Sequence, residues 1–331
     1  MTSQRQQRVA AVLAHEPQAR LPVSVWGHDF LREGSAVELA AQTIENQRRY
    51  GYDFVKINPR WTLFAEPWGN RYEAPTEQRF PRLLERRVGS AADLTDVAEA
   101  AINPAALTEH VDSVCMIVAE LGHEVDCIAT LFSPLATLGL LAGGVGQPLL
   151  SYLQEDPPAA HAALACITEV LTEHAQQLIA AGAAGIFFAP LPWTSLDVCP
   201  AEVYAEFGEP YDLIVLEPVT AAPLNMLHVC GNNIGMPRFY NYPVTVLNWD
   251  NFGPGNPTLA EVARESGKVV AGGVPHKRLH RLNADELLDV VEDAVRGVQG
   301  PLLLAGGCGI GAMTPPTSRQ AAVEIADRLT F

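Results

Sequence analysis

Short apolar runs rich in β-forming residues alternate with helical patterns along this 331-residue chain. Eight such runs are predicted to be strands, at residues 21–26, 54–57, 127–132, 185–188, 226–229, 244–247, 269–271 and 302–304. Between most of them apolar residues recur every three or four positions, most clearly over 36–50, 157–181, 201–219, 284–298 and 315–329. Eight strand–helix units in about 300 residues predict a (β/α)₈ TIM barrel, an α/β fold, as a single domain over 1–331.

The strands are continuous apolar runs more than alternating ones, as expected when a ring of helices covers the outer face of the sheet. A doubly wound sheet is the alternative fold, but it usually carries a glycine fingerprint after its first strand, and none follows Trp26. The segment 61–94 is too long for a connection between a strand and a helix, and it is rich in proline and charge. We predict that it is an inserted hairpin and loop.

Charge and hydropathy narrow the possible partners. The chain has 38 acidic and 22 basic residues, a formal net charge of −16, which repels nucleic acids and anionic membranes and leaves small molecules or a protein. The uncharged stretch 128–150 is interrupted by serine, prolines and glycines, so we predict a buried strand followed by a glycine-rich loop and not a membrane span. The N-terminal residues do not resemble a secretory signal, and we expect a cytoplasmic protein.

Two candidate metal ligands lie at the end of the fifth predicted strand, in the segment LNMLHVCGNN at 224–233. Side chains two positions apart in a strand project to the same side, so His228 and Cys230 point together. Barrel enzymes place their active sites at this end of their strands. Taken alone, however, the pair favours a buried strand over a metal site, because cysteine is among the most buried residue types.

A third candidate ligand follows the eighth predicted strand. Cys308 lies within GGCG at 306–309, whose glycines allow a sharp bend at the same end of the barrel. His228, Cys230 and Cys308 together offer one nitrogen and two sulfur donors, which suit Zn²⁺ and leave a coordination position open for catalysis. Asp250, after the sixth strand, is a candidate fourth and displaceable ligand; alternatively it orients His228 or holds its loop.

These motifs resemble those of a known family. The H-x-C-G at 228–231, followed by G-C-G-I at 307–310 and T-P-P at 314–316, is similar to the zinc-dependent, corrinoid-linked methyltransferases of the uroporphyrinogen decarboxylase superfamily. The methylcobamide:coenzyme M methyltransferases are the most similar branch. The resemblance implies a (β/α)₈ barrel in which His228, Cys230 and Cys308 bind zinc.

The resemblance also implies a reaction. Zinc would bind the thiol of a small acceptor such as coenzyme M, and the co-substrate would be a methyl-corrinoid presented by a small corrinoid protein. A zinc-bound thiol loses its proton and becomes a nucleophile for the methyl group. A homodimer is one oligomeric state that the pattern allows.

Further candidates follow other predicted strands. His28, Asn58 and Arg60 occupy positions from which they could contact substrate or corrinoid, and each has a structural role as its alternative. The basic segment PHKRLHR at 275–281 follows the seventh strand, where barrels often bind anions. A sulfonate or carboxylate on the thiol could bind there, but a solvated run of charges is the favoured interpretation.

Two other functions compete with methyl transfer. Uroporphyrinogen decarboxylases use no metal and carry an arginine-rich motif after the first strand and an aspartate near the end of the second. This chain has VWGHDFLREG at 25–34 and KINPRW at 56–61, which contain neither motif. The other alternative is a non-catalytic barrel that docks a corrinoid protein. The acceptor is also open, because Thr317, Ser318 and Arg319 stand where the methyltransferases usually have an acidic residue and an asparagine.

Overall fold

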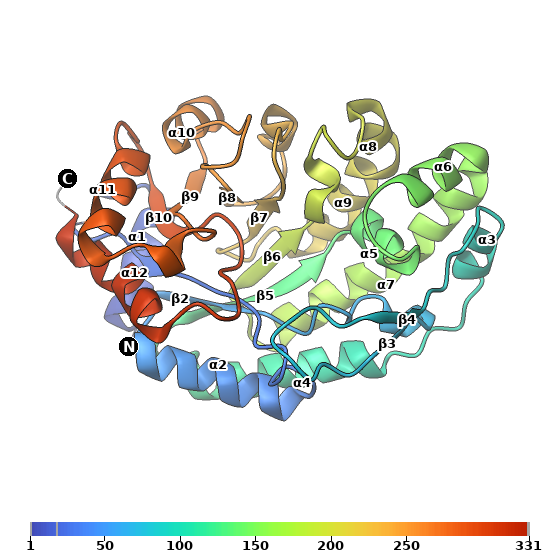
Figure 1. The fold of residues 1–331 in the computed structure, drawn as a ribbon, viewed down its shortest axis with the longest axis horizontal. Coiled ribbons are helices and arrows are strands. Elements are labelled where there is room, and N and C mark those ends of the chain that lie inside the picture. Colours follow the sequence, from blue (N-terminus) through green and yellow to red (C-terminus); the bar gives the residue numbers. More distant parts are fainter. Residues whose placement is uncertain (1, 18, 330–331) are drawn as a thin grey trace.

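Eight parallel strands form the main sheet of the computed structural model, which describes residues 2–17 and 19–329 (Figure 1). The strand order is β1-β10-β9-β8-β7-β6-β5-β2, so β1 and β2 are the two ends of the sheet. These ends meet, because the amide of Asp53 donates to the carbonyl of Val23 at 2.8 Å. The predicted (β/α)₈ barrel is therefore confirmed. Its strands are β1 Val23–Ser24, β2 Phe54–Ile57, β5 Asp126–Phe132, β6 Gly185–Ala189, β7 Met226–Val229, β8 Val246–Trp249, β9 Val269–Val274 and β10 Leu302–Gly306.

Helices surround these strands, and α2 and α4 lie side by side along the lower edge of Figure 1. Five short 3₁₀ turns lie between the described elements: η1 Glu66–Trp68, η2 Leu191–Thr194, η3 Glu217–Val219, η4 Met236–Phe239 and η5 Leu279–Arg281. The α-helices are α1 Gln4–Leu13, α2 Ala36–Tyr50, α3 Asp93–Ala98, α4 Ala105–Leu121, α5 Pro134–Leu141, α6 Gln147–Glu155, α7 Pro157–Ala180, α8 Ala201–Phe207, α9 Glu209–Leu216, α10 Leu259–Ser266, α11 Ala284–Val295 and α12 Pro316–Arg328.

Local sequence signals determine where helices begin and end. The hydroxyl of Ser35 accepts the amide of Glu38 at the start of α2, and Gly51 ends this helix with φ of 68°. Helix α2 therefore has the predicted bounds. The pattern at 201–219 is instead divided, because the chain bends at Gly208 between α8 and α9 and the last turn is 3₁₀.

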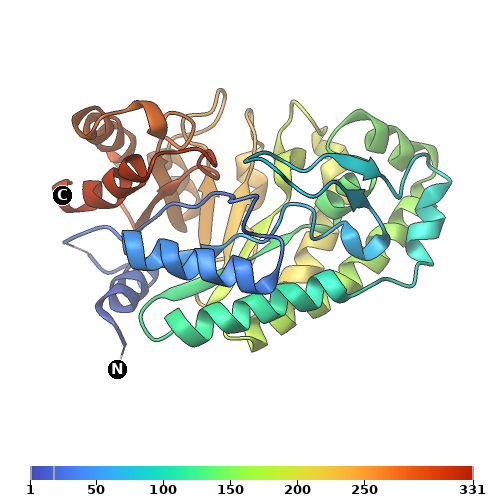
Figure 2. The same ribbon diagram turned by 60° about the horizontal axis from the view of Figure 1, so that its bottom comes forward.

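Two segments, 61–94 and 128–150, depart from the regular alternation of strands and helices. Residues 61–94 contain an antiparallel hairpin of β3 Arg71–Tyr72 and β4 Leu83–Glu85, which lies outside the main sheet (Figure 2). The uncharged stretch 128–150 holds most of β5 and the buried helix α5, so the predicted glycine-rich loop shortens to residues 142–146 before α6. None of the described helices has the length and apolar character needed to cross a membrane.

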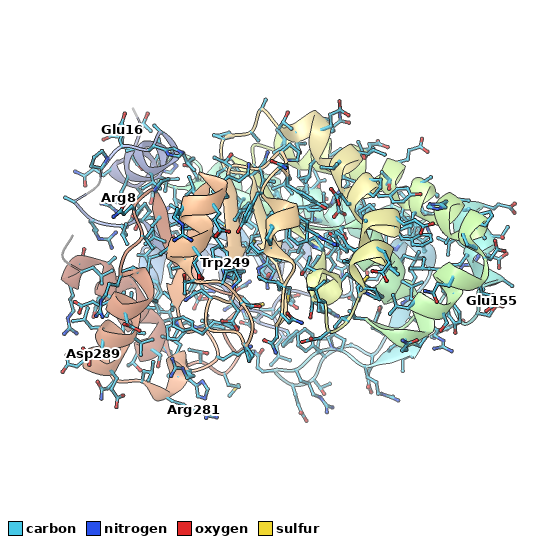
Figure 3. All side chains as sticks on the ribbon, turned by 90° about the horizontal axis from the view of Figure 1, so that it is seen from above. Arg8, Glu16, Glu155, Trp249, Arg281 and Asp289 are labelled. Carbon is cyan, nitrogen blue, oxygen red and sulfur yellow. The ribbon has the colours of Figure 1, made fainter. Side chains whose placement is uncertain are left out.

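The sixth predicted strand begins later than expected, and this shift matters for the site. Val246 pairs with Met226 of β7, so β8 covers Val246–Trp249 and not 244–247. Asn248 and Trp249 therefore lie within the strand, and Asp250 follows it directly. Trp249 is fully buried at the centre of the view in Figure 3, whereas Asp289 lies at the periphery.

Candidate metal centre

Three predicted ligands meet at the carboxyl ends of two strands. His228 lies in β7, Cys230 follows that strand directly, and Cys308 comes two residues after the end of β10. Their potential ligand atoms, one ring nitrogen and two sulfurs, all lie within 4.8 Å of one another. Zinc bonds of about 2.0–2.3 Å let one ion reach all three atoms after small side-chain adjustments.

Asn248 determines which nitrogen His228 can offer to a metal. The amide nitrogen of Asn248 donates to the carbonyls of Ala271 and Gly306, at 2.9 and 3.0 Å, so its oxygen must face the imidazole. That oxygen lies 2.7 Å from Nδ1 of His228, which therefore carries the proton and donates it. In the neutral ring Nε2 is left with a free lone pair, as a metal ligand requires.

The two thiols of the cluster differ in acidity because they contact each other. A hydrogen bond from Cys230 lowers the pKa of Cys308 well below the usual thiol range, and the nearby His228 ring acts in the same direction against the effect of burial. The same contact, together with burial, raises the pKa of Cys230. Of the two thiols, Cys308 therefore loses its proton more readily, and the deprotonated form of cysteine is the one that binds a thiophilic metal.

Asp250 is not part of this group of ligand atoms in the described residues. One of its carboxylate oxygens lies 2.8 Å from Nζ of Lys277, and the other accepts the amide of Phe252 at 3.2 Å. His276 lies farther away, with Nδ1 at 3.9 Å from the carboxylate. These contacts hold the β8 and β9 loops together, and we favour this predicted role of Asp250 over that of a fourth ligand.

A cavity of about 420 Å³ opens directly beside the cluster and includes His228, Cys230 and Cys308 in its wall. Most of the remaining wall is apolar, and residues 309–312 also line the cavity. A ligand in this cavity would contact the cluster and be shielded from water by aromatic rings. The described residues contribute six indole and phenyl rings to the wall: Trp26, Phe30, Trp61, Phe80, Phe132 and Phe187.

Two of the three candidate substrate contacts line this cavity. His28 lines it and is held by Glu33, with Nδ1 at 2.9 Å from a carboxylate oxygen. Asn58 lines it as well and is almost fully buried. Arg60 is absent from the described lining; it pairs with Glu66 at 2.7 Å and with Glu109, and it lines a separate cavity.

The basic segment 275–281 also stays outside the described lining of the cavity. His276 is buried, Lys277 pairs with Asp250, and the guanidinium of Arg278 lies 5.8 Å from the ring centroid of Phe252. Lys277 and Arg278 are thus engaged by the loop after β8. The segment does not line the cavity, but the charges of Lys277 and His276 act on the thiols of Cys230 and Cys308.

Sequence reasoning missed two polar residues of the site. Asn248 was hidden inside an apolar run, and Lys56 stands in β2 between Val55 and Ile57. The signal in each case is a single polar residue within a buried strand, VLNW for Asn248 and FVKI for Lys56. A polar group placed in a buried strand must find a partner there, so such residues are candidates for a site.

Solved structures of other proteins share the barrel fold of this chain. A methyltransferase from Methanosarcina mazei is similar over 99% of both chains, with a TM-score of 0.82 and 19% sequence identity. A B12-independent methionine synthase from Shewanella sp. W3-18-1, solved with selenomethionine, has a TM-score of 0.61 and 14% identity over 94% of both chains. At these identities the likeness concerns the fold alone.

Sequence comparison identifies the family. No curated protein sequence matches the chain significantly. The family model for uroporphyrinogen decarboxylase (URO-D), however, matches residues 4–329, which is nearly the whole chain and includes every residue of the cluster. The chain therefore belongs to the uroporphyrinogen decarboxylase family.

Proposed function

We propose that this protein is a zinc-dependent methyltransferase that moves a methyl group from a methyl-corrinoid to a small thiol. The observation that carries the proposal is the cluster of His228, Cys230 and Cys308 beside a cavity, because one nitrogen and two sulfur donors suit zinc and leave a position open. The methyltransferase from Methanosarcina mazei, which has the same fold, supports the same class of reaction.

The residues of the site fit a bound metal and prepare it for a thiol. Asn248 holds His228 in the tautomer with Nε2 free, and Cys308 is already inclined to lose its proton. When bound, zinc supplies the Lewis acidity that keeps a coordinated thiol deprotonated at neutral pH. The aromatic wall excludes water from the thiolate sulfur, which preserves its nucleophilicity toward a methyl group.

The methyl donor must approach from the open side of the cavity. We infer a methyl-corrinoid as co-substrate, carried by a small corrinoid protein that docks on the strand ends. His28 and Asn58 line the cavity and are positioned to contact the substrate or the corrinoid. Arg60 is engaged with two carboxylates, so its contact with the corrinoid would need those pairs to break.

Porphyrinogen decarboxylation, the reaction for which the family is named, fits this cavity less well. A porphyrinogen carries several carboxylates, which need several cations or hydrogen-bond donors. Within the described residues the cavity wall contains a single lysine and no arginine. The charge of the wall therefore favours a substrate with fewer negative groups.

Metal analysis of the purified full-length protein tests the proposal. We expect about one zinc per chain in the wild type, and its loss in His228→Ala and Cys308→Ala. Cys115→Ser is the matched control, because Cys115 is exposed on α4 and away from the cluster, and it should keep the metal. Wild-type protein without bound metal would contradict the proposal.

Activity separates an enzyme from a docking module. Free methylcobalamin, mixed with the protein and a panel of thiols, should lose its methyl group in a thiol-dependent reaction. The Cys115→Ser variant should retain this turnover, and His228→Ala should lose it. Zinc binding without any thiol-dependent turnover would instead favour a non-catalytic barrel that binds corrinoid.

A further inference from the structure

Lys56 places a half-buried amine in the wall of the cavity that holds the cluster. Its side chain leaves β2 toward the barrel interior, where Nζ lies 4.4 Å from the ring centroid of Phe187 and 5.9 Å from that of Trp26. Its amine donates to the side-chain oxygen of Asn58. Among the described residues that line this cavity, Lys56 is the only lysine, and arginine is absent.

This lysine lacks a carboxylate partner in the described part of the chain. Two acidic groups act on its charge: the thiol of Cys308 when ionised, and Glu33, which is paired with His28 at 2.9 Å. Taking an ammonium group partly out of water without a paired carboxylate is unfavourable, and this desolvation lowers the pKa of Lys56 to about 7. A metal bound at the cluster would take up the charge of Cys308, so an anionic group bound in the cavity would then supply the counter-charge that keeps the amine protonated.

The rest of the cavity wall favours a flat apolar body. Trp61 contacts Phe80 and Phe132 edge to face, with centroids 5.1 and 5.3 Å apart, and Trp26 contacts Phe187 in the same way at 5.4 Å. Such walls pack well against aromatic ligands. The cavity of about 420 Å³ is large enough for a ring, whereas a small acyclic thiol would leave most of the wall uncovered.

We propose that the thiol substrate of this enzyme has an aromatic body and one anionic group, and that Lys56 binds the anionic group while the sulfur faces the His228, Cys230 and Cys308 cluster. The inference rests on the proposed function for the role of the sulfur. Lys56 thereby acts as a specificity residue, and it distinguishes an aryl thiol with a carboxylate from its neutral analogue.

Binding measurements on the full-length zinc-loaded protein test this proposal, with quenching of tryptophan fluorescence as readout. The probes are 4-mercaptobenzoate, thiophenol and 2-mercaptoethanesulfonate. We expect 4-mercaptobenzoate to bind at least about tenfold more tightly than either of the others, since it alone combines the ring and the anion. Equal affinity for 4-mercaptobenzoate and thiophenol in the wild type would overturn the proposal.

Two variants of Lys56 assign the preference to this residue. Lys56→Met should remove the advantage of 4-mercaptobenzoate and leave thiophenol binding unchanged, and Lys56→Arg, which keeps the charge, should retain most of it. If Lys56→Met weakens both ligands equally, the lysine acts on the sulfur or the cluster, and the proposal is wrong. If Lys56→Met does not fold, the Lys56→Arg variant and the wild-type panel decide.

A separate binding experiment distinguishes failure of the anion site from failure of the proposed function. Benzoate lacks the thiol, so its binding to metal-free protein reports on the anion site alone. Benzoate binding that Lys56→Met abolishes, in a protein that never binds zinc, would retain the anion site and reject the methyltransferase. A protein that binds zinc and turns over neutral thiols best would reject the anion site and retain the methyltransferase.

Discussion

The oxygen of the Asn248 side chain lies 2.7 Å from Nδ1 of His228, and both residues are almost fully buried in adjacent strands. The two strands pair in a register that places these residues directly side by side. Asn248 cannot reverse its amide, because its nitrogen already donates to two backbone carbonyls. The proton on His228 is thus held on the nitrogen that faces away from the cluster.

Replacement of Asn248 should weaken zinc binding. In Asn248→Leu the imidazole loses its acceptor and its fixed tautomer, so we expect zinc affinity to fall about 10- to 100-fold in a chelator competition titration. Asn225→Leu is a matched control, because Asn225 is similarly buried and its side chain bonds, among the described residues, to the backbone of Ile186 and Val219. That variant should lose stability and keep its zinc affinity; equal zinc affinity in both variants would contradict the role of Asn248.

Gly307 should be intolerant of a side chain. A Cβ at this position would lie 2.5 Å from Cα of Asp250 and 2.7 Å from the carbonyl oxygen of Trp249, both in backbone that cannot easily move. Gly307→Ala should push the β10 loop away from β8, displace Cys308, and reduce zinc affinity by about tenfold or more.

Gly309 provides the comparison for Gly307. A Cβ there would find its nearest atoms at 3.8 Å, an ordinary contact, so Gly309→Ala should keep both the metal and the thermal unfolding temperature of the wild type. Similar losses of zinc in the two variants would indicate general sensitivity of the loop and not a specific steric conflict at Gly307.

The variant Asp250→Asn tests whether Asp250 is a fourth zinc ligand. Because Lys277 already holds its carboxylate, we expect Asp250→Asn to bind zinc as tightly as the wild type and to lose less than about 1 kcal/mol of stability. Equilibrium dialysis with zinc measures this directly. A loss of zinc comparable to that of Cys308→Ala would show that Asp250 is a ligand.

Asp212, whose buried carboxyl lies on α9, should make the stability of the protein depend on pH. Burial raises the pKa of Asp212 to about 7, although hydrogen bonds from Tyr204 and Tyr242 oppose this shift and the charge of Glu209 adds to it. Because the folded pKa is above the unfolded one, the contribution of Asp212 to stability is complete below pH of about 4 and is lost as pH rises to about 7.

Urea unfolding of wild type and Asp212→Asn at several pH values tests this dependence. The wild type should lose on the order of 2 kcal/mol relative to the variant between pH of about 5 and 7, and little more at higher pH. Asp289→Asn removes an exposed carboxylate from α11, which Figure 3 shows at the periphery, and should follow the wild type. Parallel curves for wild type and Asp212→Asn would contradict the prediction.

Several elements of the barrel could be predicted because their signals are local. The bounds of α2, β2 and β7 agree with the predicted 36–50, 54–57 and 226–229. β8 was misplaced by two residues, because apolar character does not show where pairing begins; the register against β7 decides it. Strand β1 is only two residues long, since its pairing with β10 is limited to Val23 and Ser24.

The donor types at the candidate site were also determined by the sequence alone, because His228 lies within a predictable strand, and Cys230 and Cys308 follow predictable strands. Only the tertiary structure decided how these side chains are arranged. Closure of the barrel brings residues from β7 and β10 together, the strand register places Asn248 beside His228, and Lys56 enters the same cavity from β2. These relationships depend on pairing between distant strands, and such long-range geometry leaves no pattern in the spacing of neighbouring residues.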